Sequence, residues 1–477
     1  MEKLNSKRIP AALAVVTFAL FAGIVLSRTE KMAEPDPYAY RASIVALSHG
    51  DVKLTQDEYT ALNNELQDTS LGGGVMQWHQ NDDGYWVSEK NPGYPFLALP
   101  FYGLGILRWA PLFYGLLGCF GLWIGARRWI GEWGALFAIG GYLSAAVSMV
   151  MAWRSTMPTF TDSSLIAFGI GTLIWTTLAL DQSKRKRVIA GTTAFLALGL
   201  AFSSRYTNVM VLGVAAIFAL VLCVRPRWGL GWKVLIPWGI AAAIPVALSA
   251  WYNLYVFGGL TSTGYQSTSG VFTLDSISRN LKVMPGHLWK SMPIFVVGLT
   301  AIADFVFEQL HYKKVDTADV DAEREVAEIN PEQRHTDRWI GMLLVASWIV
   351  IWGLYSMFEW TANMAGGAGP GGGPRGPGGM SGPTYSVVRF YTPVLGVIAL
   401  LAAWLFTKTY KSFVLGLIVV LFAVGINGFV DTTSSGWSNM NFRGGPGGMG
   451  AQNGQPMMPG QGGYAPNGGP PTSTTSP

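Results

Sequence analysis

The sequence has few cysteines, few charged residues and none of the common nucleotide-binding motifs. The two cysteines, Cys119 and Cys223, each lie inside an apolar run, which excludes a disulfide framework and a thiolate metal site. Charged residues make up 13% of the chain, against roughly 25% in a soluble domain. No P-loop, nucleophile elbow or dinucleotide fingerprint is present. His49, His79 and His287 lack the spacing of zinc ligands. This is not the composition of a water-soluble enzyme.

Apolar runs of membrane-spanning length are what the sequence has instead. Hydrophobic residues make up 50% of the 477 residues. The runs predict an all-α polytopic membrane protein of about eleven transmembrane helices, at residues 9–27, 110–126, 133–153, 163–180, 188–203, 206–224, 234–252, 292–310, 339–358, 392–406 and 412–430. The first run lacks a small-residue cleavage site at its end, so we expect an uncleaved anchor.

Basic residues gather in the short loops between these runs. The chain has 33 Lys+Arg and 28 Asp+Glu, and this placement indicates membrane topology and no nucleic-acid partner. The basic loops at 127–128, 184–187, 225–233 and 408–411 fall on the side of the N-terminus. The positive-inside rule makes that side cytoplasmic and the C-terminus extracytoplasmic. We expect a multi-pass protein of a bacterial or archaeal plasma membrane.

The predicted organisation is one transmembrane domain over residues 1–430 and a tail over 431–477. A large first outer loop at 28–94 contains two predicted helices, around 38–48 and 56–66. A charged loop at 311–338 is expected in the cytosol, and a Gly-rich loop at 361–389 is expected outside. The outer tail is rich in Gly and Pro and is predicted to be disordered, because it cannot bury enough apolar surface.

Candidate catalytic residues lie in the first outer loop. Glu34 and Asp36 each precede a proline, which favours extended backbone and places both side chains on one side. Two carboxylates there can supply a general base with an orienting partner, or hold a divalent ion. An exit turn with two solvated acids is the alternative. Lys90, where the loop enters the next apolar segment, is placed either to meet a lipid phosphate or to snorkel to the interface.

Three more charged residues are expected on the outer side. Asp162 opens the fourth predicted span, where it is either a helix N-cap or a site residue. Arg205 interrupts the apolar stretch between the fifth and sixth spans, and Arg389 begins the tenth. Together with the acids of the first loop, they point to an outward site at the membrane surface.

Taken in order, these motifs resemble the GT-C glycosyltransferases, most closely the branch of the protein O-mannosyltransferases and the lipid A aminoarabinose transferase. The resemblance covers about residues 9–430 and leaves the Gly-rich loop and tail unmatched. It is carried by Glu34-Pro35-Asp36-Pro37-Tyr38, Pro92-Gly93-Tyr94-Pro95, Asp162, Trp251-Tyr252-Asn253 with Phe257-Gly258, Thr263-Gly264-Tyr265, and Arg389-Phe390-Tyr391-Thr392-Pro393.

The resemblance implies a GT-C-like bundle that transfers a sugar, with inversion, from a polyprenyl-phosphate-linked donor to a protein, lipid or glycan acceptor at the outer face. It implies the following residue roles: Asp36 or Glu34 as base, Asp162 as a further catalytic acid, Lys90, Arg205 and Arg389 at the donor phosphate, and Tyr38, Tyr265 and Tyr391 as acceptor or sugar contacts.

Two questions stay open at this point. Pro35 separates acids that are adjacent in the family, so the choice between Glu34 and Asp36 is open. No cofactor is certain, and a divalent ion, Mn²⁺ or Mg²⁺, held by Asp36 and Asp162 is also open. The alternatives to an enzyme are a non-catalytic GT-C-like scaffold of a membrane assembly and a polytopic transporter. The few charges within the predicted spans argue against the transporter.

Overall fold

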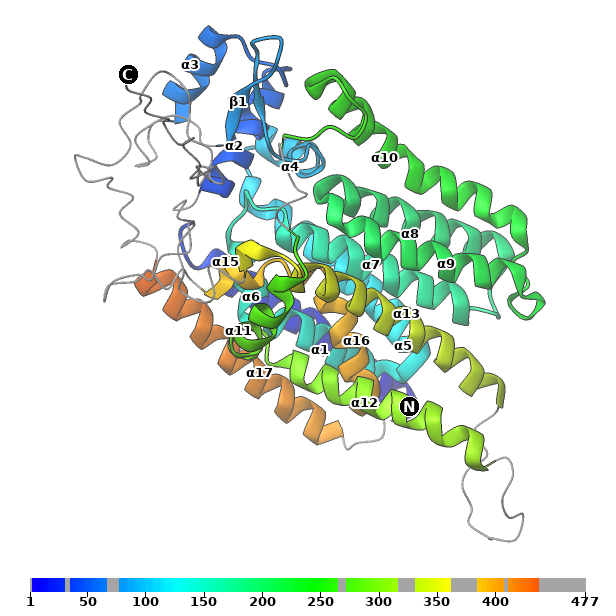
Figure 1. Ribbon diagram of the computed structural model, residues 1–477. Helices are drawn as coiled ribbons and strands as arrows, with labels where there is room; N and C mark the ends of the chain where they lie inside the picture. Colours follow the sequence, from blue (N-terminus) through cyan, green and yellow to red (C-terminus); the bar gives the residue numbers. More distant parts are fainter. Residues whose placement is uncertain are drawn as a thin grey trace, which may run out of the picture.

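The computed structural model describes residues 2–30, 35–66, 77–264, 272–315, 331–361, 384–406 and 411–436. These form a bundle of long helices with a small folded segment at one end, opposite the N-terminus (Figure 1). Glu34, Tyr265 and most of the predicted cytosolic loop, Gly-rich loop and tail lie outside the described residues.

Helices occupy all of the predicted spans. The bundle contains α1 (Glu2–Leu26), α5 (Ala110–Ser144), α6 (Ala146–Trp153), α7 (Thr159–Leu178), α8 (Lys184–Ser204), α9 (Val209–Val224), α10 (Leu235–Phe257), α11 (Asp275–Ser291), α12 (Ile294–Val315), α13 (Pro331–Ser356), α15 (Thr384–Val388), α16 (Leu395–Leu405) and α17 (Lys411–Asp431). Helices make this an all-α polytopic protein, as the apolar runs predicted.

The number of complete spans differs from the predicted eleven. Within the described residues, seven helices are long and apolar enough to cross a membrane, or eight if α11 and α12, which meet at a bend of 114°, form one span. The predicted span 110–126 and the start of the predicted span 133–153 both lie in α5, whose backbone leaves helical geometry between them, at Gly131, where φ is 79°. The apolar helix over Thr392–Leu405 is shorter than the 18 residues required of a complete span. The apolar runs therefore located the helices correctly, but a count of eleven spans is not confirmed.

Glycines bring α5 and α7 into close contact. A Cβ added to Gly125 would lie 2.3 Å from the carbonyl oxygen of Gly171, and one added to Gly171 would lie 2.2 Å from that of Gly121. Small residues allow helix backbones in membranes to approach this closely. The contact fixes α7 inside the bundle, and the first turn of α7 carries Asp162.

The outer segment is formed by α2 (Pro35–Ser48), α3 (Gln56–Leu66), β1 (Trp78–Gln80), β2 (Trp86–Ser88) and α4 (Gly93–Gly103). Both helices predicted in this loop are present. The two short strands pair antiparallel, with Trp78 opposite Ser88, and this hairpin was not predicted. The Asn81 side chain donates to the carbonyl of Val256 at 2.9 Å, which ties the hairpin to the end of α10.

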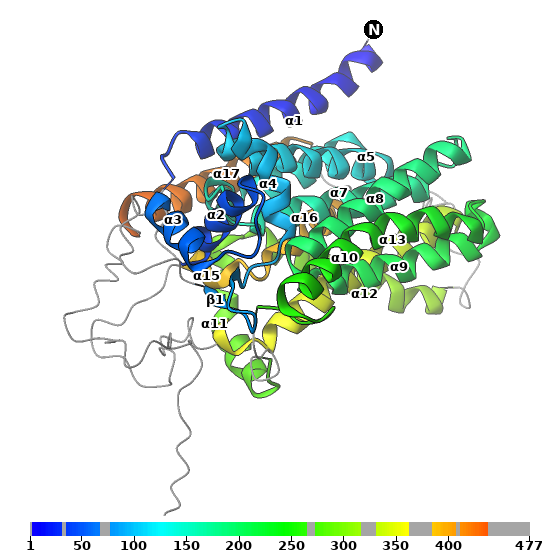
Figure 2. The ribbon, with the colours of Figure 1, turned by 90° about the horizontal axis from the view of Figure 1, so that it is seen from above.

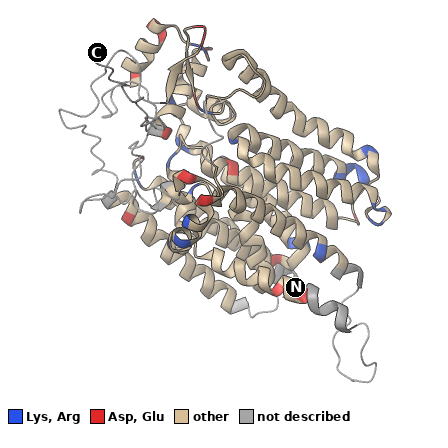
Figure 3. Cartoon of the chain, in the orientation of Figure 1, with Lys and Arg blue, Asp and Glu red and all other residues tan. Residues whose placement is uncertain are grey.

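Charge is distributed unevenly along the bundle. Lys and Arg gather where α8 and α9 are farthest from the outer segment, and the long helices between carry few charges (Figure 3). Arg185 and Lys186 at this end are exposed. From above, α1 runs along one edge of the bundle, beside α5 (Figure 2). The uncharged middle of the bundle has the composition of membrane-embedded helices.

Candidate active site

Asp36 lies in the first turn of α2, and its backbone is helical. The prediction of extended backbone at this residue was therefore wrong. Pro35 begins the helix, and proline suits the first helical position because its fixed φ is compatible with the helix and its missing N–H needs no partner there. A carboxylate in a first helical turn is stabilised by the helix dipole. The sequence thus places a fixed negative charge where the outer segment meets the bundle.

Two cations contact the Asp36 carboxylate from different parts of the chain. Lys90 Nζ lies 2.7 Å from Asp36 Oδ1, and Arg389 Nη2 lies 2.5 Å from Asp36 Oδ2. Lys90 follows β2, and Arg389 follows α15. The side chains are 4%, 9% and 17% exposed for Lys90, Arg389 and Asp36. Lys90 is therefore buried in an ion pair, and the alternative of a snorkelling lysine is excluded.

Aromatic rings lie close to the two cations that contact Asp36. The Lys90 ammonium lies 5.7 Å from the ring centroid of Tyr40, and the Arg389 guanidinium lies 5.0 Å from that of Phe390 and 5.7 Å from that of Trp360. Ring faces attract cations, and more strongly when water is excluded. The rings hold the two cations at the edge of the outer segment.

The electrostatics of Asp36 follow from this arrangement. Burial alone would raise the pKa of its carboxyl, but the charges of Lys90 and Arg389 outweigh burial and hold the pKa well below its usual range. A hydrogen bond from the Gln77 side chain acts in the same direction. Asp36 therefore carries a full negative charge at neutral pH and is a weak base while both cations contact it.

A second ion pair lies beside the first. Asp162 is fully buried, and its Oδ2 lies 2.8 Å from Arg205 Nε. α7 begins at Thr159, three residues earlier, and Pro158 occupies the N-cap position. The N-cap alternative for Asp162 is therefore excluded. Asn208 also donates to Asp162 Oδ2, at 3.3 Å.

Arg205 connects the two ion pairs. Its Nη1 donates to the main-chain carbonyl of Arg389 at 3.3 Å, and its Nη2 donates to the Thr159 hydroxyl at 2.9 Å. The structure thus brings together five of the predicted site residues: Asp36, Lys90, Asp162, Arg205 and Arg389.

The predicted tyrosines are placed differently. Tyr38 is buried in the core of the outer segment, where its hydroxyl donates to the carbonyl of Leu66 at 3.1 Å. Tyr391 is buried below Arg389, and its hydroxyl donates to the carbonyl of Tyr355 at 3.0 Å. Tyr265 lies outside the described residues.

Two residues near the site were not predicted. Gln77 has a φ of 66°, a left-handed conformation that costs roughly 1–3 kcal/mol for a residue other than glycine and clusters at functional sites. Glu30, which follows α1 by four residues, accepts a hydrogen bond from the Ser155 hydroxyl, and burial raises the pKa of its carboxyl. No sequence pattern marks either residue, because both depend on contacts with distant segments.

Of the four carboxylate oxygens of Asp36 and Asp162, Asp162 Oδ1 alone has no partner among the described residues. Both oxygens of Asp36 contact cations, and Oδ2 of Asp162 contacts Arg205. Among the residues that the structure describes, no group of three His, Cys, Asp or Glu side chains could hold a metal. Divalent ions of the Mg²⁺ type prefer several oxygen ligands that are free to coordinate.

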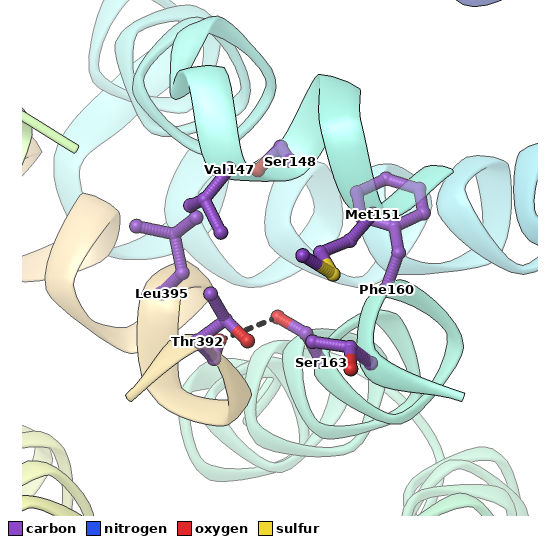
Figure 4. A pocket seen from close by; sticks show the side chains of 8 residues that line it. Val147, Ser148, Met151, Phe160, Ser163, Thr392 and Leu395 are labelled. Atoms are coloured by element: carbon purple, nitrogen blue, oxygen red, sulfur yellow. Dashed lines mark hydrogen bonds between the residues drawn. The ribbon is translucent and has the colours of Figure 1, made fainter. Parts of the chain in front are cut away.

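A small pocket lies next to the second ion pair, between α6, α7 and the segment after Arg389 (Figure 4). Its lining includes Val147, Met151 and Phe160, and Ser163 crosses it to donate to the carbonyl of Thr392 at 2.9 Å. Its lining contains no charged side chain. The pocket therefore lacks the groups needed to bind a phosphate and belongs to the support of the site.

No protein-family model matches the sequence, and no curated protein matches it. The fold is similar to that of ArnT from Cupriavidus metallidurans bound to undecaprenyl phosphate, with a TM-score of 0.51, 14% sequence identity, and coverage of 87% of this chain and 62% of that chain. The apo state of the same protein gives a TM-score of 0.50, 15% identity, and coverage of 88% and 63%.

The apo oligosaccharyltransferase of Archaeoglobus fulgidus gives a TM-score of 0.47, 10% identity, and coverage of 88% of this chain and 56% of that chain. This chain spans about three fifths of the length of the ArnT chain. The matches to ArnT cover nearly nine tenths of this chain. The chain therefore has the fold of the GT-C glycosyltransferases, as its motifs predicted.

Proposed function

We propose that this protein is an integral membrane glycosyltransferase that transfers a sugar from a polyprenyl-phosphate carrier to an acceptor hydroxyl at the outer membrane face. The observation that carries the proposal is the contact of one carboxylate, Asp36, with two buried cations, Lys90 and Arg389. This reaction needs a carboxylate that can accept a proton and cations that can bind a phosphate. ArnT, which has a similar fold, binds undecaprenyl phosphate, and this supports a carrier of that kind as the donor.

The proposed step is a direct displacement with inversion. The acceptor oxygen attacks the anomeric carbon of the sugar and loses its proton to Asp36. The bond between the anomeric carbon and the phosphate oxygen breaks, and its electron pair leaves with the carrier phosphate. Lys90 and Arg389 stabilise the charge that develops on that phosphate.

The two cations link donor binding to the strength of the base. A phosphate that binds Lys90 and Arg389 competes with Asp36 for the same positive charges. As their hold on the carboxylate weakens, the pKa of Asp36 rises toward the range in which a carboxylate accepts a proton readily.

The acceptor is protein, lipid or glycan. A scaffold would bind a carrier without turnover, and a transporter would move its substrate unchanged.

The proposal predicts transfer without a metal ion. Because cations of the protein already contact Asp36 and Asp162, we expect turnover to survive an excess of EDTA within about twofold, since no metal is needed at these acids. Initial rates with and without the chelator test this. Loss of activity that Mn²⁺ or Mg²⁺ restores would instead assign a metal to Asp36 and Asp162.

The orientation is also proposed from the charges of the loops. Cysteine introduced at the exposed Asp57 should react with an impermeant maleimide on intact cells, and cysteine at the exposed Arg185 should react only after lysis. The native Cys119 and Cys223 are buried and give a low background. The reverse pattern would place the site on the cytoplasmic side.

Turnover itself is tested with the purified full-length protein in lipid nanodiscs. The substrates are undecaprenyl phosphates that carry different radiolabelled hexoses, with membrane lipid or cell-envelope extract as acceptor. We expect one donor to be consumed and its label to be transferred. Carrier binding without consumption of any donor would support the scaffold.

A further inference from the structure

Each guanidinium nitrogen of Arg205 already has a partner within the protein. Nε contacts Asp162 at 2.8 Å, Nη2 donates to Thr159 at 2.9 Å, and Nη1 donates to the Arg389 carbonyl at 3.3 Å. The arginine side chain has one fork of three nitrogens, and each has a partner within the protein. These contacts commit three of its five N–H donors to the protein, which favours a structural role for Arg205 over the contact with the donor phosphate that the family resemblance implies.

The main chain that carries Arg389 is held by side chains from other elements. The carbonyl of Arg389 accepts from Arg205 and from the Thr392 hydroxyl, the latter at 2.6 Å. The carbonyl of Tyr391 accepts from Trp352 Nε1 at 3.2 Å. The carbonyl of Thr392 accepts from the Ser163 hydroxyl (Figure 4). Three main-chain groups are thus fixed from α7, α13 and the segment between α8 and α9.

The first of these groups is the one closest to the reaction. The Arg389 carbonyl belongs to the residue whose guanidinium contacts Asp36 at 2.5 Å. A shift of that main chain moves the guanidinium by a similar amount. A misplacement of about 1 Å that originates away from the reacting groups can cost about a hundredfold in rate.

We infer that Asp162 and Arg205 are positioning residues, which act on the reaction by fixing the main chain of Arg389 and so the place of its guanidinium at the donor phosphate. Asp162 is fully buried and orients Arg205 through the ion pair, and Arg205 in turn fixes the main chain of Arg389 through its hydrogen bond to the carbonyl. The inference rests on the proposed function, but its central contact can also be tested without turnover.

Arg205→Lys is the test variant. Lysine keeps the positive charge near Asp162 but has a single nitrogen, so it cannot also reach Thr159 and the Arg389 carbonyl. We expect kcat/KM for the donor to fall about 10- to 100-fold. Arg187→Lys is the matched control. Arg187 lies near the start of α8, whereas Arg205 follows its end, and the Arg187 guanidinium likewise donates to carbonyls, those of Thr176 and Trp228. It should leave turnover within about twofold.

A double-mutant cycle separates positioning from direct contact. If Arg205 acts through Arg389, Arg205→Lys should have less than a twofold effect in the Arg389→Ala background. If Arg205 binds the phosphate itself, the two losses should multiply, and the inference fails. Asp162→Asn should show the same loss of coupling.

Hydrogen–deuterium exchange provides a readout that does not depend on turnover. The amides of Arg389 and Tyr391 donate to the carbonyls of Tyr385 and Val388. In Arg205→Lys we expect these amides to exchange at least tenfold faster, with α2 unchanged. Unchanged exchange at these amides would overturn the inference even if transfer is observed. If the parent protein transfers no sugar, faster exchange would still support the positioning contact, and only the proposed function would fail.

Discussion

Asp36→Asn is expected to lower sugar transfer by about 10²- to 10⁴-fold, the usual loss when a general base is removed. Asparagine keeps the shape of the side chain but cannot accept the acceptor proton. It also removes the negative charge that Lys90 and Arg389 share, and the loss of one partner from a buried ion pair costs about 3–5 kcal/mol of stability. The thermal midpoint in detergent must therefore be measured together with the initial rate.

Asp57→Asn is the matched control for this variant. Asp57 also lies in the first turn of a helix of the outer segment, but its side chain is exposed. It should insert, fold and turn over like the parent protein. Glu34→Gln should be milder than Asp36→Asn if Asp36 is the base. Normal transfer by a well-folded Asp36→Asn protein would remove Asp36 as the base and favour the scaffold.

Lys90→Ala and Arg389→Ala are each expected to lose about 10- to 1,000-fold in kcat, by analogy with the removal of one donor to a developing oxyanion. Both variants take a positive charge from the leaving phosphate. Arg389→Lys should recover only part of the rate, because an ammonium cannot replace the planar fork of arginine. Donor-dependent kinetics at a fixed acceptor concentration measure these effects.

The control for the loss of a lysine is Lys53→Ala. Lys53 also forms an ion pair in the outer segment, at 3.2 Å from Asp83, but away from Asp36. Arg279→Ala is the control for the loss of an arginine. Arg279 also contacts a carboxylate, that of Glu359, but its side chain is 48% exposed. If Lys90→Ala and Arg389→Ala behave like these controls, the two cations only stabilise the fold, and the donor phosphate binds elsewhere.

Local patterns in the sequence predicted the helices well. Residues 38–48 and 56–66 are helical, and the apolar runs all fall on helices, because helix formation depends on neighbouring residues and on contact with lipid. The kink at Gly131 lies between two predicted spans, but the break near Ala145, inside the predicted span 133–153, was not predicted, since an apolar run looks the same whether it is straight or bent. Extended backbone was predicted at Asp36, which is helical. The prediction rested on Pro37, which follows Asp36, whereas Pro35 begins the helix.

The sequence pointed to five charged residues that the structure brings together, but not to the ion pairs between them. Lys90 and Arg389 were expected at a phosphate, and the structure places both on Asp36. The pairing of Arg205 with Asp162 was also not foreseen. Partners of this kind come from segments far apart in the chain, and a single sequence contains no signal for which acid meets which cation.

The contact between Asp36 and Arg389 has a consequence for how the protein is made. The two residues are 353 positions apart, whereas Asp36 and Lys90 are 54 positions apart. At about 5–20 residues per second, the roughly 300 residues between Lys90 and Arg389 take about 15–60 s to synthesise. During that time the nascent chain can form the ion pair of Asp36 with Lys90 but not the one with Arg389. We therefore expect the growing polypeptide to cross a membrane that contains carrier lipids without acting on them, until translation has passed Arg389.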